Sequence, residues 1–301
     1  EMCIRDRYKQ MAGRAGRPQY DPFGEAIIAD ANPEEAERYI SSKPEKVSSS
    51  LWSERALRIH ILATIASGFA KDTKGLIEFF SKTFGAQSYR FIFAKFMVSR
   101  VINQLQRMGM IINDEGSLIA TKLGELVSKL YVDPLTAHMI IQNLEKVSAN
   151  NISNLYYLHV IAMTPDFTRM RITRYKELRD EALSLADEGY IPNPVELDVD
   201  FRIWLKAYKI ARILENWIEE VDEDTIITRY GIGLGDLSTI IDTATWLTHA
   251  ASKICMVMSM NKHGKRLELL RLRIENGVKE DVIELVKLRG IGRVRARTLY
   301  K

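Results

Sequence analysis

The stretch Asp236-Leu-Ser-Thr-Ile-Ile-Asp-Thr-Ala-Thr-Trp246, continued as Leu247-Thr-His-Ala-Ala-Ser-Lys253, belongs to an amphipathic segment that runs to Met260. Its apolar residues recur every three or four positions, which is the period of one helix face. The spacing predicts a helix over residues 236–260, with Asp236 as the N-cap. A long helix with one apolar stripe predicts a helical bundle and a mainly α fold. The stripe consists of Leu237, Ile240, Ile241, Ala244, Leu247, Ala251, Ile254 and Met258.

Trp246 does not belong to this stripe. At ~100° per residue it lies more than a quarter-turn from the centre of the stripe, beside Thr239, Asp242, His249 and Lys253. A tryptophan there either packs against a neighbouring domain or presents its ring to something flat. Burial is the usual fate of a large aromatic side chain, so both interpretations stay open at this point.

The bundle is predicted to extend over residues 134–260, where prolines mark loops between long periodic stretches. Trp204 and Trp217 lie in a helix predicted over residues 200–220, and we expect both in the core. Met256, Met258 and Met260 are interpreted as packing residues rather than as soft metal ligands.

Outward toward the carboxyl end, Leu288-Arg-Gly-Ile-Gly-Arg-Val-Arg-Ala-Arg297 follows the apolar Val282-Ile-Glu-Leu-Val286. The pattern predicts a helix, a tight turn through Gly290 and Gly292, and a second helix that is short because the sequence stops at Lys301. We interpret residues 261–301 as a truncated helix-hairpin-helix. Its glycines would let a phosphate approach the backbone, and the first amides of the second helix would bind it.

Charge supports a nucleic-acid partner for this tail. Residues 253–301 carry 13 Lys/Arg against five acids, whereas the chain as a whole has a net charge of +4. Arg293, Arg295 and Arg297 would add charge around the phosphate contact. The alternatives are a protein-binding helical hairpin and an ordinary solvated helix surface.

Upstream, residues 46–133 are predicted to form a winged helix. Three helices are expected, one capped by Ser53 and running to about Ser67, one from Thr73, and one over 98–108. Residues 110–120 alternate through an Asp-Glu-Gly turn, as a β-hairpin wing would. The third helix offers only Arg100 and Arg107 as cations, which are few for a groove-reading surface, so we do not expect it to read duplex DNA.

At the amino end the sequence reads Gln10-Met-Ala-Gly-Arg-Ala-Gly-Arg17 and is followed by an apolar stretch, 24–29, with the pattern of a buried strand. If the octet is helical, Arg14 and Arg17 share one face and their guanidiniums could reach the γ-phosphate of a nucleotide bound mainly by another domain. The alternative is a Gly-Arg loop or a solvated basic turn.

Tyr8-Lys-Gln-Met-Ala-Gly-Arg-Ala-Gly-Arg-Pro18 resembles the last helicase motif of superfamily 2 motors, most closely that of the Ski-type DNA helicases. The downstream order of elements resembles the archaeal lagging-strand repair helicases, which are related to the helicase half of DNA polymerase theta. The resemblance implies the C-terminal portion of an ATP-dependent 3′ to 5′ DNA helicase. Residues 1–45 would then be the remnant of a second RecA-like domain with its linker, with 1–7 foreign to the family.

The resemblance also implies roles for individual residues. Arg14 and Arg17 would be catalytic, while Gln10 and Gly13 would contact ATP, which binds with Mg²⁺ mainly in domains that this chain lacks. The family stacks a tryptophan of its ratchet helix on a base, which implies a DNA contact for Trp246. We assign the same surface to Lys253, together with Gly290, Gly292, Arg293, Arg295 and Arg297 of the tail.

One position departs from the family pattern. An arginine often stands two turns before the stacking tryptophan, and this chain has Thr239 there. The Gly-x-x-x-x-Gly-Lys-Ser/Thr loop that cradles a triphosphate does not occur in the sequence, so we do not expect the chain to hydrolyse ATP as it stands.

Composition limits which other classes of protein the chain could represent. The two cysteines and five scattered histidines give neither a disulfide framework nor a metal-ligand pair. No apolar run approaches the roughly 18 residues of a membrane helix. We expect a cytoplasmic monomer that binds single-stranded and forked DNA. Two alternatives stay open, a DNA-binding module without motor function and an RNA helicase of the same superfamily.

Overall fold

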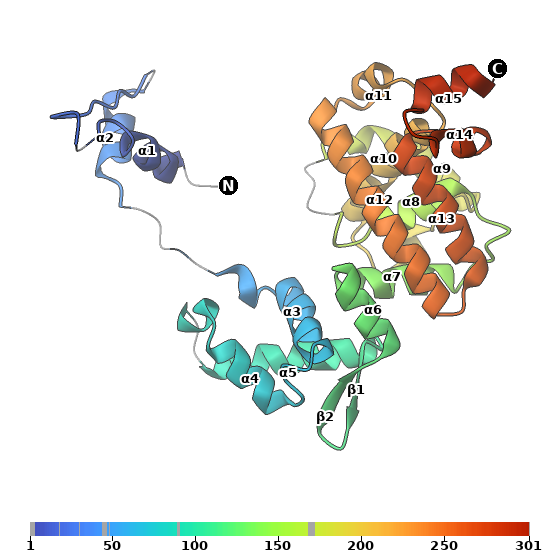
Figure 1. Ribbon diagram of the computed structural model, residues 1–301, viewed down its shortest axis with the longest axis horizontal. Helices are drawn as coiled ribbons and strands as arrows, with labels where there is room; N and C mark the ends of the chain where they lie inside the picture. Colours follow the sequence, from blue (N-terminus) through green and yellow to red (C-terminus); the bar gives the residue numbers. More distant parts are fainter. Residues whose placement is uncertain are drawn as a thin grey trace. The chain divides into compact units, whose positions relative to one another are not determined.

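The computed structural model describes residues 4–17, 19–29, 31–43, 47, 49–88, 91–167 and 172–300. The chain divides into two compact units, Glu1–Ser50 and Leu51–Lys301. The described residues are mainly helical, and the sheet among them is a single antiparallel pair of strands (Figure 1). The mainly α fold class is therefore confirmed.

The first unit contains α1 (Ile4–Ala12) and α2 (Pro33–Ser41). The ring centres of Tyr8 and Tyr39 lie 6.1 Å apart, and Lys9 Nζ donates to the carbonyl oxygen of Ile40 at 2.7 Å. Asn32 caps α2 by accepting from the Glu35 amide at 2.8 Å, as its side-chain oxygen is suited to do.

Residues 24–29 do not form the predicted strand. They are not paired in a sheet, and Ile27 is 87% exposed. The apolar pattern of a strand is stable only when its backbone groups pair with a neighbouring strand. No described residue of this unit supplies such a strand, so the prediction is wrong for the chain as it stands.

The second unit begins with a short 3₁₀ turn, η1 (Ser50–Trp52), and three helices, α3 (Glu54–Ala66), α4 (Thr73–Ser81) and α5 (Phe91–Arg107). A second 3₁₀ turn, η2 (Phe84–Ser88), lies between α4 and α5. Ser53 caps α3 through the Ala56 amide, as predicted. The third helix starts seven residues before the predicted Val98.

The predicted hairpin forms from β1 (Ile111–Asp114) and β2 (Ser117–Ala120), in a register that pairs Ile111 with Ala120. Glu115 and Gly116 at its tip both have positive φ, 48° and 92°. This is the backbone of a tight hairpin turn whose twist matches the strands. The chain then enters α6 (Lys122–Leu130).

The bundle consists of α7 (Pro134–Leu144), α8 (Asn154–Ala162), α9 (Arg179–Asp187), α10 (Phe201–Ile218), α11 (Glu223–Tyr230), α12 (Leu234–Val257) and α13 (Asn261–Asn276). Two 3₁₀ turns, η3 (Tyr175–Leu178) and η4 (Pro194–Glu196), lie before α9 and α10. The long helices α12 and α13 pack side by side (Figure 1). Trp204 and Trp217 are buried in this core, as predicted.

Helix α12 differs from the prediction at both ends. Gly233 is its N-cap, and Asp236, the third helical residue, accepts from the Gly233 amide at 2.9 Å. The prediction of Asp236 as the N-cap is wrong because the carboxylate reaches back to the cap instead of standing at it. The helix ends at Val257, three residues before Met260.

The apolar stripe of α12 faces the core. Leu237, Ile240, Ala244, Leu247, Ala251 and Ile254 are buried, whereas Ile241 and Met258 are half-buried. Cys255 is buried beside them, and this burial raises the pKa of its thiol to about 12. The thiol therefore stays protonated at neutral pH.

The tail folds as predicted into helix, turn and helix. It contains η5 (Glu280–Val282), α14 (Ile283–Val286) and α15 (Arg293–Tyr300), and Gly290 in the turn has φ 84°. A small core of its own is formed by Val278, Val282, Ile283 and Ala296. None of the described helices is long and apolar enough to cross a membrane.

Candidate nucleic-acid interface

Trp246 lies on α12 with its side chain only partly covered. The residue is 37% exposed, and its Nε1 donates to the carbonyl oxygen of Leu130 at 3.0 Å. Leu130 is the last residue of α6, so the hydrogen bond joins the two helices. The indole is thus fixed at its polar edge while part of its surface stays open to solvent.

The exposed side of α12 carries a row of polar residues with Trp246 in its middle. Thr239, Trp246 and Lys253 follow one another at seven-residue intervals, which places them on one side of the helix ~10 Å apart. Asp242 and His249 flank the row. The Nδ1 of His249 lies 3.8 Å from a carboxylate oxygen of Glu268 on α13. This arrangement agrees with the polar face predicted for the helix.

The corner between α6 and α7 supplies the acceptor for Trp246. Tyr131 follows Leu130 in the left-handed conformation, with φ 58°, and its side chain is exposed. Val132 and Asp133 are buried, and Asp133 caps α7 by accepting from the Leu135 amide at 3.0 Å. The acceptor carbonyl therefore stands three residues before a buried carboxylate.

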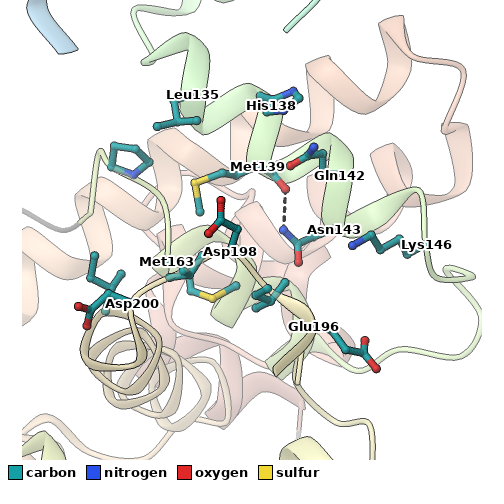
Figure 2. Close-up of a pocket in the computed structure, with 14 residues that line it drawn as sticks. Leu135, His138, Met139, Gln142, Asn143, Lys146, Met163, Glu196, Asp198 and Asp200 are labelled. Atoms are coloured by element: carbon teal, nitrogen blue, oxygen red, sulfur yellow. Dashed lines mark hydrogen bonds between the residues drawn. The ribbon is translucent and has the colours of Figure 1, made fainter. Parts of the chain in front are cut away.

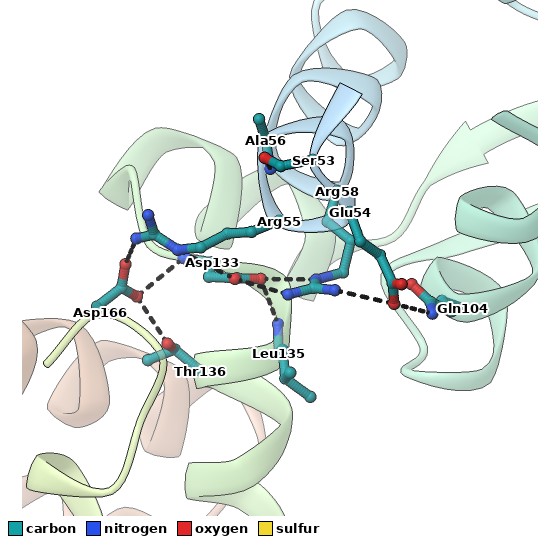
Figure 3. Close-up of polar contacts among 10 residues, drawn as sticks. All are labelled: Ser53, Glu54, Arg55, Ala56, Arg58, Gln104, Asp133, Leu135, Thr136 and Asp166. Atoms are coloured by element: carbon teal, nitrogen blue, oxygen red, sulfur yellow. Dashed lines mark hydrogen bonds and ion pairs between the residues drawn. The ribbon is translucent and has the colours of Figure 1, made fainter. Parts of the chain in front are cut away.

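That carboxylate is the centre of a buried ionic cluster (Figure 3). Arg58 of α3 donates to both Asp133 oxygens, from Nε at 3.0 Å and from Nη2 at 2.9 Å. Arg55 pairs with Asp133 at 3.4 Å and with Asp166. Asp166 also accepts from the Asp133 amide at 3.1 Å and from the Thr136 hydroxyl at 2.6 Å. Arg58 also pairs with Glu54 at 3.4 Å, so two arginines share three carboxylates, of which those of Asp133 and Asp166 are buried.

Sequence reasoning did not identify this cluster. Arg58 is only 7% exposed, although most of the other buried positions of its helix are apolar, such as Leu57 and Ile61. A charged residue among the buried positions of an amphipathic helix is a signal that a partner charge is near. The partner itself comes from 75 residues away.

The tail presents an open turn. A Cβ placed on Gly290 or on Gly292 would meet no atom within 4 Å. The first amides of α15 have no acceptor within the helix, as holds for any helix start. Arg295 is exposed, and its Nη1 donates to the Gly290 carbonyl oxygen at 2.7 Å. The turn therefore has room for an anion beside unpaired amides and a guanidinium.

The other two arginines of the tail have partners inside the protein. Arg293 donates to the Val221 carbonyl, and its guanidinium lies 4.5 Å from the ring centre of Trp217. Burial lowers the pKa of Arg293. Of the three arginines predicted to contact phosphate, Arg293 is thus half-buried against the bundle.

Arg297 bridges Glu220 and Asp281, with nitrogen-to-oxygen distances of 2.7 to 2.9 Å. The bridge lowers the pKa of both carboxyl groups and raises that of Arg297. Its charge is therefore balanced inside the protein. Phosphate contacts by Arg293 and Arg297 stay predictions.

In the first unit, α1 ends at Ala12, immediately before Gly13. Gln10 lies in the last turn of α1, and the Gly13 amide donates to the Lys9 carbonyl at 2.9 Å. Arg14 lies in the turn after the helix. Arg14 and Arg17 would share one helix face only if residues 10–17 were all helical. The helix ends at Ala12, so the two arginines do not lie on one helix face.

Arg14 and Arg17 are both exposed. The Arg17 amide donates to Asp21 Oδ2 at 2.8 Å, and the guanidinium lies 5.3 Å from the ring centre of Tyr20. These contacts leave both guanidiniums accessible to a ligand. A contact of either guanidinium with a nucleotide stays a prediction.

A cavity of about 690 Å³ opens between α7 and the loop that precedes α10 (Figure 2). His138, Gln142 and Asn143 line one side, and Asp198 extends toward them from the loop. Burial lowers the pKa of His138, which Glu145 partly offsets. None of the site residues predicted from the sequence lines this cavity. In the part of the chain that the structure describes, no group of three His, Cys, Asp or Glu side chains is placed to hold a metal ion.

Comparison with known proteins identifies relatives of this chain. The family described as archaeal helicase, domain 4, matches residues 155–277. The chain is 38% identical to the ATP-dependent DNA helicase Hel308 of Pyrobaculum calidifontis, over 97% of this chain and 41% of that protein. It is 39% identical to Hel308 of Methanocella arvoryzae, over 97% and 40%. For Hel308 of Caldivirga maquilingensis the identity is 35%, over 97% and 41%.

The chain thus spans about two fifths of the length of these relatives. The matched domain model covers α8 to α13, which include Trp246 and its helix. The resemblance first drawn from the Gln10 to Arg17 motif is confirmed over nearly the whole chain. The chain is thus homologous to part of Hel308, an archaeal ATP-dependent DNA helicase, over nearly all of its own residues.

Proposed function

We propose that this chain is the strand-binding part of an ATP-dependent helicase that moves 3′ to 5′ on single-stranded DNA and unwinds forked DNA. The observation that carries the proposal is Trp246, whose ring is partly exposed on the polar side of α12 and fixed by Leu130. A base can stack on such a ring whatever its identity, which is what a motor that tracks any sequence requires. The names and coverage of the relatives support the same reading.

Within this proposal the chain has four parts. Residues 1–45 belong to a second RecA-like domain and its linker, and 46–133 form a winged helix, supported by the order of α3, α4, α5 and the hairpin. Residues 134–277 form the ratchet bundle. The boundary predicted at residue 260 would place α13 with the tail, but α13 packs along α12 in the bundle. The helix-hairpin-helix is therefore assigned to residues 278–301, supported by the turn at Gly290 and by its separate small core.

DNA runs along the exposed row of α12 and then meets the tail. Trp246 stacks on a base, and Lys253, two turns further on and half-buried, pairs with a backbone phosphate. At the tail, amides near Gly290 and Gly292 bind a phosphate without reading sequence, with Arg295 adding charge. Arg293 and Arg297 contribute mainly by holding the tail on the bundle.

ATP and Mg²⁺ would be held mainly by domains outside this chain. Arg14 and Arg17 would place positive charge beside the γ-phosphate, where charge develops during hydrolysis. Gln10 and Gly13 would contact the nucleotide from the end of α1. In a longer protein that contains the phosphate-binding loop, Arg17→Ala should abolish hydrolysis while sparing ATP binding. Loss of ATP binding instead would assign Arg17 to the ground-state complex.

The DNA part of the proposal is tested with the present chain. Binding to labelled single-stranded DNA, duplex DNA and an RNA strand of equal length is measured across a salt series. The proposal expects a salt-sensitive preference for single-stranded DNA and a monomeric protein. Preference for duplex would support a DNA clamp without motor function, and preference for RNA would support an RNA helicase.

Trp246→Ala is the matched variant. Loss of base stacking should weaken single-strand binding by ~1 to 3 kcal/mol. Tyr190→Ala removes a half-exposed aromatic ring from the loop after α9, outside the row on α12, and serves as the control. Unchanged binding by Trp246→Ala would show that the indole only packs between α12 and α6.

A further inference from the structure

A continuous path of contacts connects α3 with the indole of Trp246. It starts at Arg58, passes through the buried carboxylate of Asp133, and follows the backbone to Leu130. The Leu130 carbonyl oxygen then accepts from Trp246 Nε1 at 3.0 Å. All of these residues lie in the second unit. The helix that begins the winged-helix segment therefore contacts the support of the proposed base-stacking residue.

The corner that carries the acceptor needs to be held from its flanks. Tyr131 has φ 58°, a left-handed conformation that residues other than glycine adopt infrequently. Its own side chain cannot hold the corner, because it is 80% exposed. The residues that fix the corner are therefore those on either side, namely α6 before it and the buried Val132 and Asp133 after it.

Asp133 is held more tightly than a simple helix cap requires. Its carboxylate accepts from Arg58 through both oxygens, pairs with Arg55 and caps α7, while its amide donates to Asp166. A two-pronged arginine contact fixes orientation as well as distance. The cluster therefore fixes Asp133 at the start of α7, three residues after Leu130.

We propose that Arg58 and Asp133 are positioning residues for Trp246, so that α3 sets the orientation in which the indole meets a DNA base. This inference rests on the proposed function of Trp246 and adds the contacts that hold its ring in orientation before DNA binds. An aromatic ring already held in its binding orientation loses less freedom when a base stacks on it. Loosening the corner should weaken stacking without removing any group that touches DNA.

A double-mutant cycle tests the coupling. Asp133→Asn removes the carboxylate that Arg58 contacts through both oxygens, leaves Glu54 as the charged partner of Arg58, and keeps an oxygen that can cap α7. Trp246→Phe removes the Nε1 donor but keeps a ring on which a base can stack. We expect Asp133→Asn to weaken single-strand binding threefold or more in the parent chain and to change it little in Trp246→Phe. If Asp133→Asn weakens binding by the same factor in the parent chain and in Trp246→Phe, Asp133 does not act through Trp246. The inference is then overturned.

A spectroscopic readout keeps the test independent of affinity. In protein labelled with fluorotryptophan, Trp246→Phe identifies the Trp246 resonance among the four. Asp133→Asn should shift or broaden that resonance and leave those of Trp204 and Trp217 in place. If the Trp246 resonance is unchanged, the corner does not orient the indole.

Two further variants serve as a substitute for Asp133→Asn and as a control. Arg58→Lys keeps the charge but loses the two-pronged contact, and replaces Asp133→Asn if that protein fails to fold. Lys82→Gln breaks the exposed ion pair with Glu78 at the end of α4, away from the corner and from α12, and should leave both readouts as in the parent. Failure of the proposed function is distinct, because Trp246→Ala would then bind single-stranded DNA as well as the parent does.

Discussion

The guanidinium of Arg293 lies over the ring of Trp217, 4.5 Å from its centre, and thereby docks α15 onto α10. Trp217 is itself fixed, since its Nε1 donates to the Ile274 carbonyl at 2.7 Å. An arginine that the sequence assigns to a phosphate is thus part of the attachment of the tail. The three arginines of α15 consequently differ in what they do, although they lie within five residues of one another.

Arg293→Ala should loosen the tail without unfolding the bundle. The cation–π contact is worth about 1 kcal/mol at a half-buried site, and the hydrogen bond to Val221 is lost with it. Hydrogen exchange should therefore speed up for amides of α14 and α15 and stay unchanged in α8 and α10. Arg295→Ala removes the same charge without either contact and is the control. Equal exchange in both variants would contradict the docking role.

Arg295→Ala should instead alter the salt dependence of binding to single-stranded DNA. Each lost phosphate contact lowers the slope of log affinity against log salt by roughly 0.7 on a single strand. Arg297→Ala should change this slope less, because Glu220 and Asp281 already balance its charge. A larger change for Arg297 than for Arg295 would reverse the assignment of roles within the tail.

His159 should make the stability of the bundle depend on pH. It is fully buried, and burial lowers its pKa from 6.5 to about 4 in the folded protein. Because the unfolded chain binds the proton more readily, stability is complete above pH 6.5 and falls as the pH decreases toward 4. The loss over that window is roughly 3 kcal/mol.

His159→Gln keeps a donor for the Trp204 carbonyl, which His159 Nε2 contacts at 2.9 Å, but does not titrate. Urea unfolding at several pH values should therefore show a flatter profile for this variant between pH 6.5 and 4. His60→Gln, at an exposed position, is the control and should keep the parent profile. A parent-like slope for His159→Gln would assign the pH dependence to other groups.

Two glycines should respond oppositely to alanine. Gly277 ends α13 with φ 61°, and a Cβ there would lie 2.5 Å from the Trp217 ring, so Gly277→Ala should destabilise the protein by more than ~1 kcal/mol. Gly235 lies within α12 with no atom within 4 Å of a Cβ. Gly235→Ala should stabilise the protein by up to ~1 kcal/mol, because alanine is the better helix former. Thermal unfolding measures both, and a stabilised Gly277→Ala would refute the steric argument.

Much of the helical layout could be predicted from periodicity and capping residues. Three features depend only on residues a few positions apart and can therefore be predicted from local sequence. They are the Ser53 cap, the Asp-Glu-Gly hairpin and the core face of α12. Asp236 shows where local reasoning is ambiguous. Asp suits both the cap and the third helical position, and only the backbone shows that Gly233 is the cap.

The contacts that support the site could not be predicted in this way. The spacing alone places Trp246 on the polar face of its helix. Its hydrogen-bond acceptor, however, is a backbone carbonyl 116 residues away. Every residue has such a carbonyl, so no residue type in the sequence identifies it. Arg297 likewise finds Glu220 and Asp281 only once α10 and the tail pack together. The strand expected over 24–29 has the right composition, but a strand is stable only beside another strand.

The buried thiol of Cys255 has a practical consequence for watching this protein at work. A maleimide dye reacts with thiolate, and a thiol whose pKa is raised to about 12 stays unlabelled while the fold is intact. With Cys3 replaced by serine, a cysteine introduced at the exposed Thr239 would carry the only dye on α12. Passage of a strand along this helix could then be followed as a fluorescence signal, with the interior of the bundle left as it is.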